Sequence, residues 1–373
     1  MPLYYGEGRM RLFRVFSSLL AVLFVMDSCA LGNSLTLPEP KGNYGVGMVN
    51  VELMDPARTQ LRSPDKHRWM ATVFYPTLKT RATAPYMTGT LDDGNVCGTK
   101  VLGHAIPGAM IIQDHQFPII ISFPGRGGER QKETILYEAL ASHGYIVITM
   151  DQPYVANFVK FPDGTKITLT FKDVWNLPRD RDYRYIYDDE IIARAIKDID
   201  FLLDHLLFFG DLSKAFDTKN IVLMGHSIGA NIAHIHGFAY KRIKAVVDID
   251  SKITERAVFG RIGIPPNPHA KPVLFIRGML QYQEDVGDQL TKIANSTIWR
   301  PNVQHSAFSD DAYFAAKIPN YGMGFWHSVY NWLFKKGPYF STTDTSLGDN
   351  PVDEWFEKYP EYILKWLDKI TKV

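Results

Sequence analysis

The stretch NIVLMGHSIGANIAHIHGFA, from Asn220 to Ala239, decides the fold. It begins with an apolar run of strand length, passes through the pentapeptide GHSIG at 225–229, and continues as a small-residue segment that can be helical. A strand, a sharp turn and a helix in this order are typical of a nucleophile elbow, which exposes its serine, here Ser227, at the carboxyl end of the strand. The turn strains the serine backbone, and the flanking glycines keep bulk away from the neighbouring strand and helix. The alternative is a tight strand-to-helix turn that happens to contain a serine.

The residues around Ser227 also predict an oxyanion site. The amide of Ile228, at the start of the helix, points to where negative charge would develop on a substrate oxygen. A second amide is expected from the loop PGRGG at 124–128, which follows the apolar strand Phe117 to Phe123, and Gly125 and Arg126 are its natural donors. A phosphate-binding loop is the alternative. It is not favoured, because the loop lacks a Gly-Lys-Ser or Gly-Lys-Thr ending and the three-glycine dinucleotide spacing.

A serine hydroxyl is a poor nucleophile at neutral pH, so it needs a base and a carboxylate that orients the base. In this fold class the chain order is serine, acid, histidine, each at the carboxyl end of a strand. The first strand after the elbow helix, Ile243 to Ile249, ends in Asp248, Ile249 and Asp250. We predict Asp250 as the acid because it lies at the strand exit, with the deeper Asp248 as the alternative.

Three histidines follow these aspartates. His269 precedes a predicted strand and so lies at the wrong end of the sheet, and His327 lies in a predicted helix. His305 lies in a loop before a predicted helix that Ser309 caps, so we predict His305 as the base. The alternative for each is a surface or core histidine held by hydrogen bonds. His226 is expected to support the elbow rather than to accept the proton.

Composition excludes several classes of function. The chain has 373 residues, 46% of them hydrophobic, which is ample for a large core. The net charge is +1 and no basic block occurs, so we expect no nucleic-acid partner. Two cysteines, Cys29 and Cys97, make neither a disulfide framework nor a metal-ligand spacing, and His234 and His236 are too close along a helix to share a metal ion. We therefore expect no metal and no cofactor.

The amino terminus resembles an export signal. Arg9, Arg11 and Arg14 precede an apolar run from Val15 to Met26, which has the length of a signal-peptide core. Residues 1–30 are therefore predicted to be a signal peptide, cleaved after Ala30, followed by a linker at 31–43. A lipoprotein signal with Cys29 as the lipidated residue is the alternative. We expect an exported protein that is periplasmic, secreted or anchored to a membrane.

Residues 44–373 are predicted to form a single α/β domain. Strands alternate with helices, which indicates a doubly wound, mostly parallel sheet with helices on both faces. Loop insertions are expected at about 77–116 and 152–187, the first as a substrate-covering loop or as plain surface irregularity. The aromatic residues of 312–373 are expected in the core of two helices, with a membrane-docking face as the alternative. The predicted strands are Tyr44–Leu53, Trp69–Tyr75, Phe117–Phe123, Tyr145–Met150, Ile243–Ile249 and Val273–Ile276, and the clearest helices are Glu133–His143 and Asp188–Phe209.

Several segments, spread over roughly Gly42 to Ala316, match one family. They are GNYGVG at 42–47, VFYP at 73–76, FPIIISFPGRGG at 117–128 with the following LASHGYIV, GHSIGA at 225–230, VVDID at 246–250 and NVQHSAFSD at 302–310. Through them the chain resembles the plasma and intracellular type II platelet-activating factor acetylhydrolases and their bacterial relatives among the α/β hydrolases. The resemblance implies Ser227 as nucleophile, Asp250 as acid, His305 as base, and the amides of Arg126 and Ile228 as the oxyanion hole. It also implies a calcium-independent serine esterase that acts on short sn-2 acyl groups of phospholipids.

The chain departs from this family at three places. The family has Ser-His-Gly or a close variant at the oxyanion loop, where this chain has Phe123, Pro124 and Gly125. The excursion after Asp151 and the carboxyl-terminal region also differ, and these parts would shape an acyl or headgroup pocket. A broad carboxylesterase acting on small or polyester substrates is therefore the second hypothesis, and a non-catalytic binding protein with the same fold is the third.

Overall fold

The structure, a computed structural model, describes residues 34–87, 93–169, 181–251, 267–278, 293–319, 321 and 347–372, with the backbone alone for 181–189. The predicted signal peptide with Cys29 lies outside the described residues, as does His327. No helix in the described ranges is long and apolar enough to cross a membrane.

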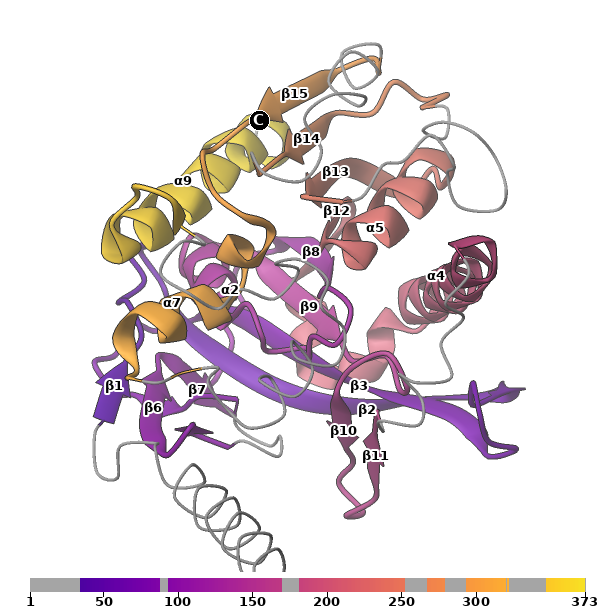
Figure 1. Cartoon of the computed structure of the whole chain (residues 1–373), viewed down its shortest axis with the longest axis horizontal. Coiled ribbons are helices and arrows are strands. Elements are labelled where there is room, and N and C mark those ends of the chain that lie inside the picture. The colour runs from indigo at the N-terminus through magenta and orange to yellow at the C-terminus, as the bar shows by residue number, and fades with distance from the viewer. Residues whose placement is uncertain are drawn as a thin grey trace, which may run out of the picture.

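A mixed nine-stranded sheet organises the described part of the chain, in the order β15-β14-β13-β12-β8-β9-β3-β2-β7 (Figure 1). The six strands from β15 to β9 are parallel to one another, whereas β3 pairs antiparallel with β9 and with β2. The carboxyl ends of β8, β12 and β13 therefore meet at one edge of the sheet, where the predicted site residues follow them. The strands are β2 Gly45–Thr59, β3 Lys66–Thr77, β7 Ala105–Pro107, β8 Phe117–Phe123, β9 Ile146–Met150, β12 Phe216–His226, β13 Ile243–Ile249, β14 Val273–Ile276 and β15 Ser296–Trp299.

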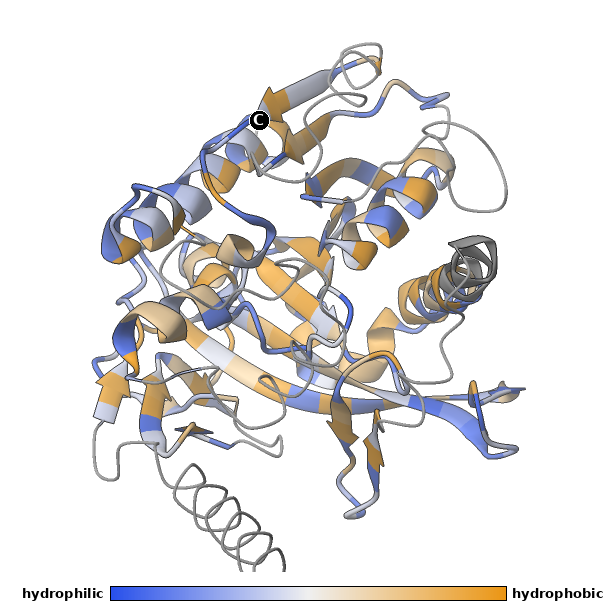
Figure 2. Ribbon diagram, in the orientation of Figure 1, coloured by the Kyte–Doolittle hydropathy of each residue, from blue (hydrophilic) through white to orange (hydrophobic). Residues whose placement is uncertain are grey.

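The central strands are apolar on both faces because both faces are covered. All seven residues of β8 are buried, as the continuous apolar run predicts, and Figure 2 shows the central strands in orange. Ile120 packs into the hydrophobic cluster on one face of the sheet, while Ile119 and Ile121 pack into the cluster on the other. Each of these side chains, fully buried, stabilises the fold by about 1.5–3 kcal/mol.

Helices α2 Thr134–Ser142, α7 Asp310–Lys317 and α9 Val352–Thr371 lie on one side of the sheet, and α4 Arg181–Asp204 and α5 Ile228–Ala239 lie on the other (Figure 1). This arrangement confirms the predicted fold class, a doubly wound α/β sheet with helices on both faces. The helix predicted over 133–143 is α2, and Gly144 follows it with a φ of +89°, as a C′ glycine should.

The aromatic side chains at the start of α9 belong to the core. Trp355 and Tyr359 are 1% exposed, and their rings stack at 5.6 Å. The indole Nε1 of Trp355 donates to the carbonyl of Ala307 at 2.9 Å, in the short 3₁₀ helix η2 that spans His305–Phe308. The core interpretation of these aromatic residues is therefore confirmed for α9, and the helix supports the segment that carries the predicted base.

Three segments differ from the prediction. Residues 34–36, predicted as part of the linker 31–43, form the strand β1, and Leu37 is buried in the core. Residues 77–116, expected as an irregular loop, form β4 Ala84–Pro85, β5 Asn95–Val96, β6 Thr99–Gly103 and β7, and β6 pairs with β1 Ser34–Thr36. Helix α4 begins at Arg181, within the predicted insertion, rather than at Asp188, and it ends at Asp204 rather than at Phe209. The chain continues as the 3₁₀ helix η1 Leu206–Ala215. The apolar residues Leu206 and Phe209 keep a helical spacing and are buried, so the pattern does not reveal the change of helix type.

Candidate active site

The elbow has the geometry that its sequence predicts. Ser227 lies between β12 and α5 with φ 56° and ψ −118°, a strained conformation for a residue other than glycine. A Cβ atom on Gly225 would lie 2.3 Å from the backbone of Gly229, and one on Gly229 would lie 2.1 Å from the carbonyl oxygen of Phe123. Both glycines are therefore required by close backbone packing, which fixes the serine at the carboxyl end of β12.

Asp250 and His305 form a short hydrogen bond beside this elbow. The ring Nδ1 of His305 donates to Asp250 Oδ2 at 2.6 Å, and the amide of Gly278 donates to Asp250 Oδ1 at 2.9 Å. Burial alone would raise the pKa of Asp250, but the bond from His305 and the positive charge of Arg277 outweigh burial and hold that pKa below its ordinary value. The aspartate is therefore ionised, and it leaves Nε2 of His305 as the nitrogen that can accept a proton.

Pairing of β12 with β13 brings the serine to this pair. The amide of Ser227 donates to the carbonyl of Ile249 at 2.9 Å, one residue before Asp250. The rings of His226 and His305 lie 4.6 Å apart. Within the described residues no hydrogen bond joins the Ser227 hydroxyl to His305, which is common in catalytic pairs before a substrate tightens them.

Asp248, the alternative acid, has other partners. Its carboxylate accepts from Arg277 at 2.7 Å, from His234 Nδ1 at 2.9 Å and from the Ser251 hydroxyl at 2.7 Å. Burial opposes the charge of Asp248, but Arg277 and His234 lower its pKa well below the ordinary value. Asp248 is thus a buried carboxylate held by fixed partners, and Asp250, not Asp248, contacts His305.

The glycine-rich loop lies against the elbow. A Cβ atom on Gly125 would lie 3.4 Å from Cβ of Ser227, so the loop backbone that includes Arg126 passes beside the nucleophile. On the other side, Ile228 is the first residue of α5, and the first amides of a helix have no partner within it. The loop is anchored behind this point by Arg130, whose main-chain amide and guanidinium both bind the buried carboxylate of Asp151 after β9.

The segment after His305 is anchored by Asp310, at the start of the predicted helix, through contacts with another helix that the sequence does not indicate. Asp310 accepts from the amides of Thr134 at 2.8 Å and Ile135 at 3.3 Å, and so it caps α2. The hydroxyl of Tyr86 donates to the same carboxylate at 3.1 Å. Ser309 lies at the predicted cap position of α7, but its side chain makes no cap hydrogen bond.

The other histidines are placed as expected or are engaged elsewhere. His269 is exposed before β14, at the far end of the sheet, and His234 and His236 face the separate carboxylates Asp248 and Asp200. His226 is buried beside the elbow, and burial with the neighbouring His305 lowers its pKa to about 3. His226 is therefore a neutral imidazole at neutral pH, and it lies beside the elbow.

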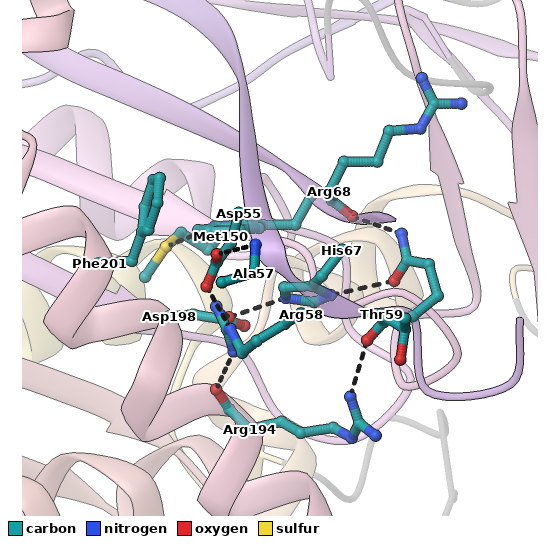
Figure 3. A network of polar contacts seen from close by, with 12 residues as sticks. Asp55, Ala57, Arg58, Thr59, His67, Arg68, Met150, Arg194, Asp198 and Phe201 are labelled. Atoms are coloured by element: carbon teal, nitrogen blue, oxygen red, sulfur yellow. Dashed lines mark hydrogen bonds and ion pairs between the residues drawn. The ribbon is translucent and has the colours of Figure 1, made fainter. Parts of the chain in front are cut away.

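A second buried histidine–carboxylate pair fastens the far end of the β2–β3 hairpin to α4 (Figure 3). His67 Nε2 lies 2.8 Å from Asp198 Oδ1, and Arg58 donates to the same oxygen at 2.7 Å. The other ring nitrogen of His67 faces Gln60 Oε1 at 3.1 Å, which leaves no nitrogen for a nucleophile. This pair is therefore structural.

Two further observations bear on the site. Among the described residues, no group of three histidine, cysteine, aspartate or glutamate side chains could hold a metal ion.

A groove of about 1280 Å³ lies between β2, β3, the residues 108–115 and η1. Because η1 precedes β12 and residue 115 nearly adjoins the start of β8, this groove lies at the amino ends of the strands, opposite Ser227.

Comparisons with known proteins agree with this geometry. No family model matches the chain. A probable 1-alkyl-2-acetylglycerophosphocholine esterase of the fungus Arthroderma benhamiae is 25% identical over 263 residues, which cover 63% of this chain and 63% of that protein. This protein is named for the reaction of the family that the sequence motifs resemble, and the resemblance is thereby confirmed. A ferulic acid esterase from Streptomyces cinnamoneus superposes with a TM-score of 0.67 at 22% identity, covering 90% of this chain and 93% of that one. The chain therefore has the α/β-hydrolase fold.

Proposed function

We propose that this chain is a serine esterase that cleaves carboxylic esters through an acyl-enzyme on Ser227. The observation that carries the proposal is the 2.6 Å bond between His305 and Asp250 beside a serine held at positive φ in an elbow. Ser227 follows β12, Asp250 follows β13 and His305 comes after β15. These strands are parallel, so the three residues lie at the same edge of the sheet. The curated relative, itself named an esterase, supports the same class of reaction.

In the proposed mechanism His305 removes the proton of Ser227 as the hydroxyl attacks the ester carbonyl. The amides of Ile228 and Arg126 stabilise the tetrahedral oxyanion, and one such donor is worth about 3 kcal/mol. His305 then protonates the leaving alcohol and activates the water that hydrolyses the acyl-enzyme. Ionised Asp250 stabilises the imidazolium that forms in both halves of the reaction.

The proposed substrate is a phospholipid with a short acyl group at the sn-2 position. The resemblance of the motifs and the name of the fungal relative support it. The second candidate is a broad carboxylesterase that acts on small or polyester substrates. The sequence Phe123, Pro124, Gly125 at the oxyanion loop favours this candidate, because it replaces the Ser-His-Gly of the phospholipid-cleaving family.

The test compares hydrolysis of a phospholipid with an sn-2 acetyl group and of p-nitrophenyl butyrate by the purified protein. Activity on both, lost in Ser227→Ala but kept in Ser213→Ala on η1, is expected for the phospholipid esterase. Activity on the small ester alone would favour the broad carboxylesterase. Activity on neither would overturn the esterase and favour a non-catalytic binding protein.

We also propose that the chain is exported, because Arg9, Arg11 and Arg14 precede the apolar run Val15 to Met26. Export would bring the enzyme to phospholipid surfaces outside the cytoplasm, where it would contact membranes. Sequencing of the amino terminus of the mature protein tests this proposal. A terminus just after Ala30 supports cleavage, a lipidated Cys29 supports an anchor, and an intact Met1 or Met10 contradicts both.

A further inference from the structure

His226 lies beside the base, the oxyanion loop and the nucleophile, although it does not take part in the proposed proton transfers. Its ring Nε2 lies 3.1 Å from the main-chain carbonyl oxygen of His305. Its Nδ1 would be 3.2 Å from a Cβ atom on Gly125, in the oxyanion loop, and it directly precedes Ser227. Because a carbonyl oxygen can only accept, Nε2 must carry the proton and donate it.

The side chain that faces the other nitrogen is Glu133, just before α2. Its Oε1 lies 3.8 Å from His226 Nδ1, and the Tyr137 hydroxyl donates to its Oε2 at 3.2 Å. Complete burial raises the pKa of Glu133 to about 8, so the group is a neutral carboxylic acid at neutral pH. At 3.8 Å the two atoms interact electrostatically rather than through a hydrogen bond. A neutral acid tolerates a lone pair on Nδ1, whereas a carboxylate would favour a proton on that nitrogen.

We propose that His226 is a positioning residue for the catalytic base, and that Glu133 selects the tautomer in which His226 holds the main chain of His305. The inference deepens the proposed function and rests on it. Asp250 holds the ring of His305 at Nδ1 and His226 holds its backbone carbonyl, so the base is fixed at two points. Ring rotation and loop displacement of His305 are then both restrained, which keeps the imidazole in one place beside the elbow.

Ionisation of Glu133 should weaken this arrangement. A carboxylate at 3.8 Å favours a proton on Nδ1, and the neutral ring then has none on Nε2 to donate to His305. The rate at which Ser227 reacts, with an ester or with a serine-directed reagent, should therefore fall as the pH rises through about 8. The described titratable groups that act on His226 or Glu133 are His305, Asp250 and Asp248 around the imidazole, and Tyr137, Asp310 and Tyr359 around the carboxyl.

The first test is the rate at which a fluorophosphonate labels Ser227, which requires the base but no particular ester. His226→Phe should lower the second-order rate about tenfold or more, the equivalent of losing one positioning hydrogen bond. His226→Gln, whose amide nitrogen can replace Nε2, should restore the rate to within about threefold of the wild type. His205→Gln is the matched control, because His205 also bonds a main-chain carbonyl, that of Phe201, at 2.7 Å but lies before η1.

The second test is the pH profile of the same labelling rate in Glu133→Gln, whose amide cannot ionise. The wild-type rate should fall above about pH 8, and this fall should be absent in the variant. The proposal is overturned if His226→Phe, folded by circular dichroism, is labelled as fast as the wild type, or if both profiles share the alkaline fall. A profile that separates the two proteins decides the matter even where His226→Phe does not fold.

These rates separate the inference from the proposed function. A wild type that is labelled at Ser227 but hydrolyses neither ester contradicts the esterase proposal, while the variants still decide the role of His226. A wild type that is not labelled overturns both.

Discussion

The protonation of buried Glu133 has a consequence for stability that does not depend on catalysis. The fold keeps this carboxyl protonated up to about pH 8, whereas the unfolded chain ionises it above its ordinary pKa of 4.5. The unfolded state therefore binds fewer protons between these values, and the stability contribution of Glu133 is complete below pH 4.5 and is lost as the pH rises toward 8. Glu133→Gln removes this loss because an amide has no proton to release.

The magnitude follows from the size of the interval. Each pKa unit corresponds to about 1.36 kcal/mol, so the free energy of unfolding of Glu133→Gln relative to the wild type should increase by about 3–5 kcal/mol from pH 4.5 to pH 8. Titrating groups that do not interact with Glu133 contribute equally to both proteins and cancel in this difference.

Urea unfolding followed by circular dichroism, at several pH values between 4.5 and 8, measures the difference. Glu357→Gln is the control, since Glu357 is half exposed and forms its ion pair with the surface residue Lys41. Its difference from the wild type should stay within about 0.5 kcal/mol at every pH. Parallel curves for Glu133→Gln and the wild type would show that Glu133 ionises at the same pH in the folded and unfolded protein, contrary to this prediction.

Three further changes test the framework of the site. Gly229→Ala should destabilise the elbow by about 3 kcal/mol, because the new Cβ atom would lie 2.1 Å from the backbone oxygen of Phe123, and a lower melting temperature checks it. Arg277→Leu leaves Asp248 without its cation and should cost about 3 kcal/mol at pH 7 in urea unfolding, with a smaller cost at acid pH, where Asp248 can protonate. Trp355→Ala should cost about 3–5 kcal/mol by the same measurement, since the ring is buried, and an unchanged midpoint would contradict the core assignment.

Local sequence patterns predict the parts of this fold whose causes are local. The strands β8 and β13 have the predicted bounds because parallel strands covered on both faces need continuous apolar residues. The hairpin of β10 Phe158–Lys160 and β11 Lys166–Thr168 follows from Asp163 and Gly164, and Gly164 has a φ of +85°. The elbow is recognisable because two glycines mark where backbones approach closely.

The candidate acid, base and nucleophile can also be predicted from the sequence, because chain order and the ends of the strands restrict the choice. The residues that hold them in place cannot be predicted in this way. Asp310 caps a helix 176 residues earlier in the chain, and Arg277 reaches Asp248 across 29 residues. Such partners depend on how the strands are ordered in the sheet, and no local pattern encodes that order. The short strands within 77–116 escape prediction for the same reason, since their pairing partners are distant.

Whether Ser227 is the nucleophile is measured by the intact mass of the protein after reaction with a fluorophosphonate, followed by peptide mapping. One adduct is expected, on the peptide that contains Ser227. It should be absent in Ser227→Ala and form much more slowly in His305→Ala. An adduct on another residue, or ester hydrolysis that persists in Ser227→Ala, would contradict the claim that Ser227 is the nucleophile of this fold.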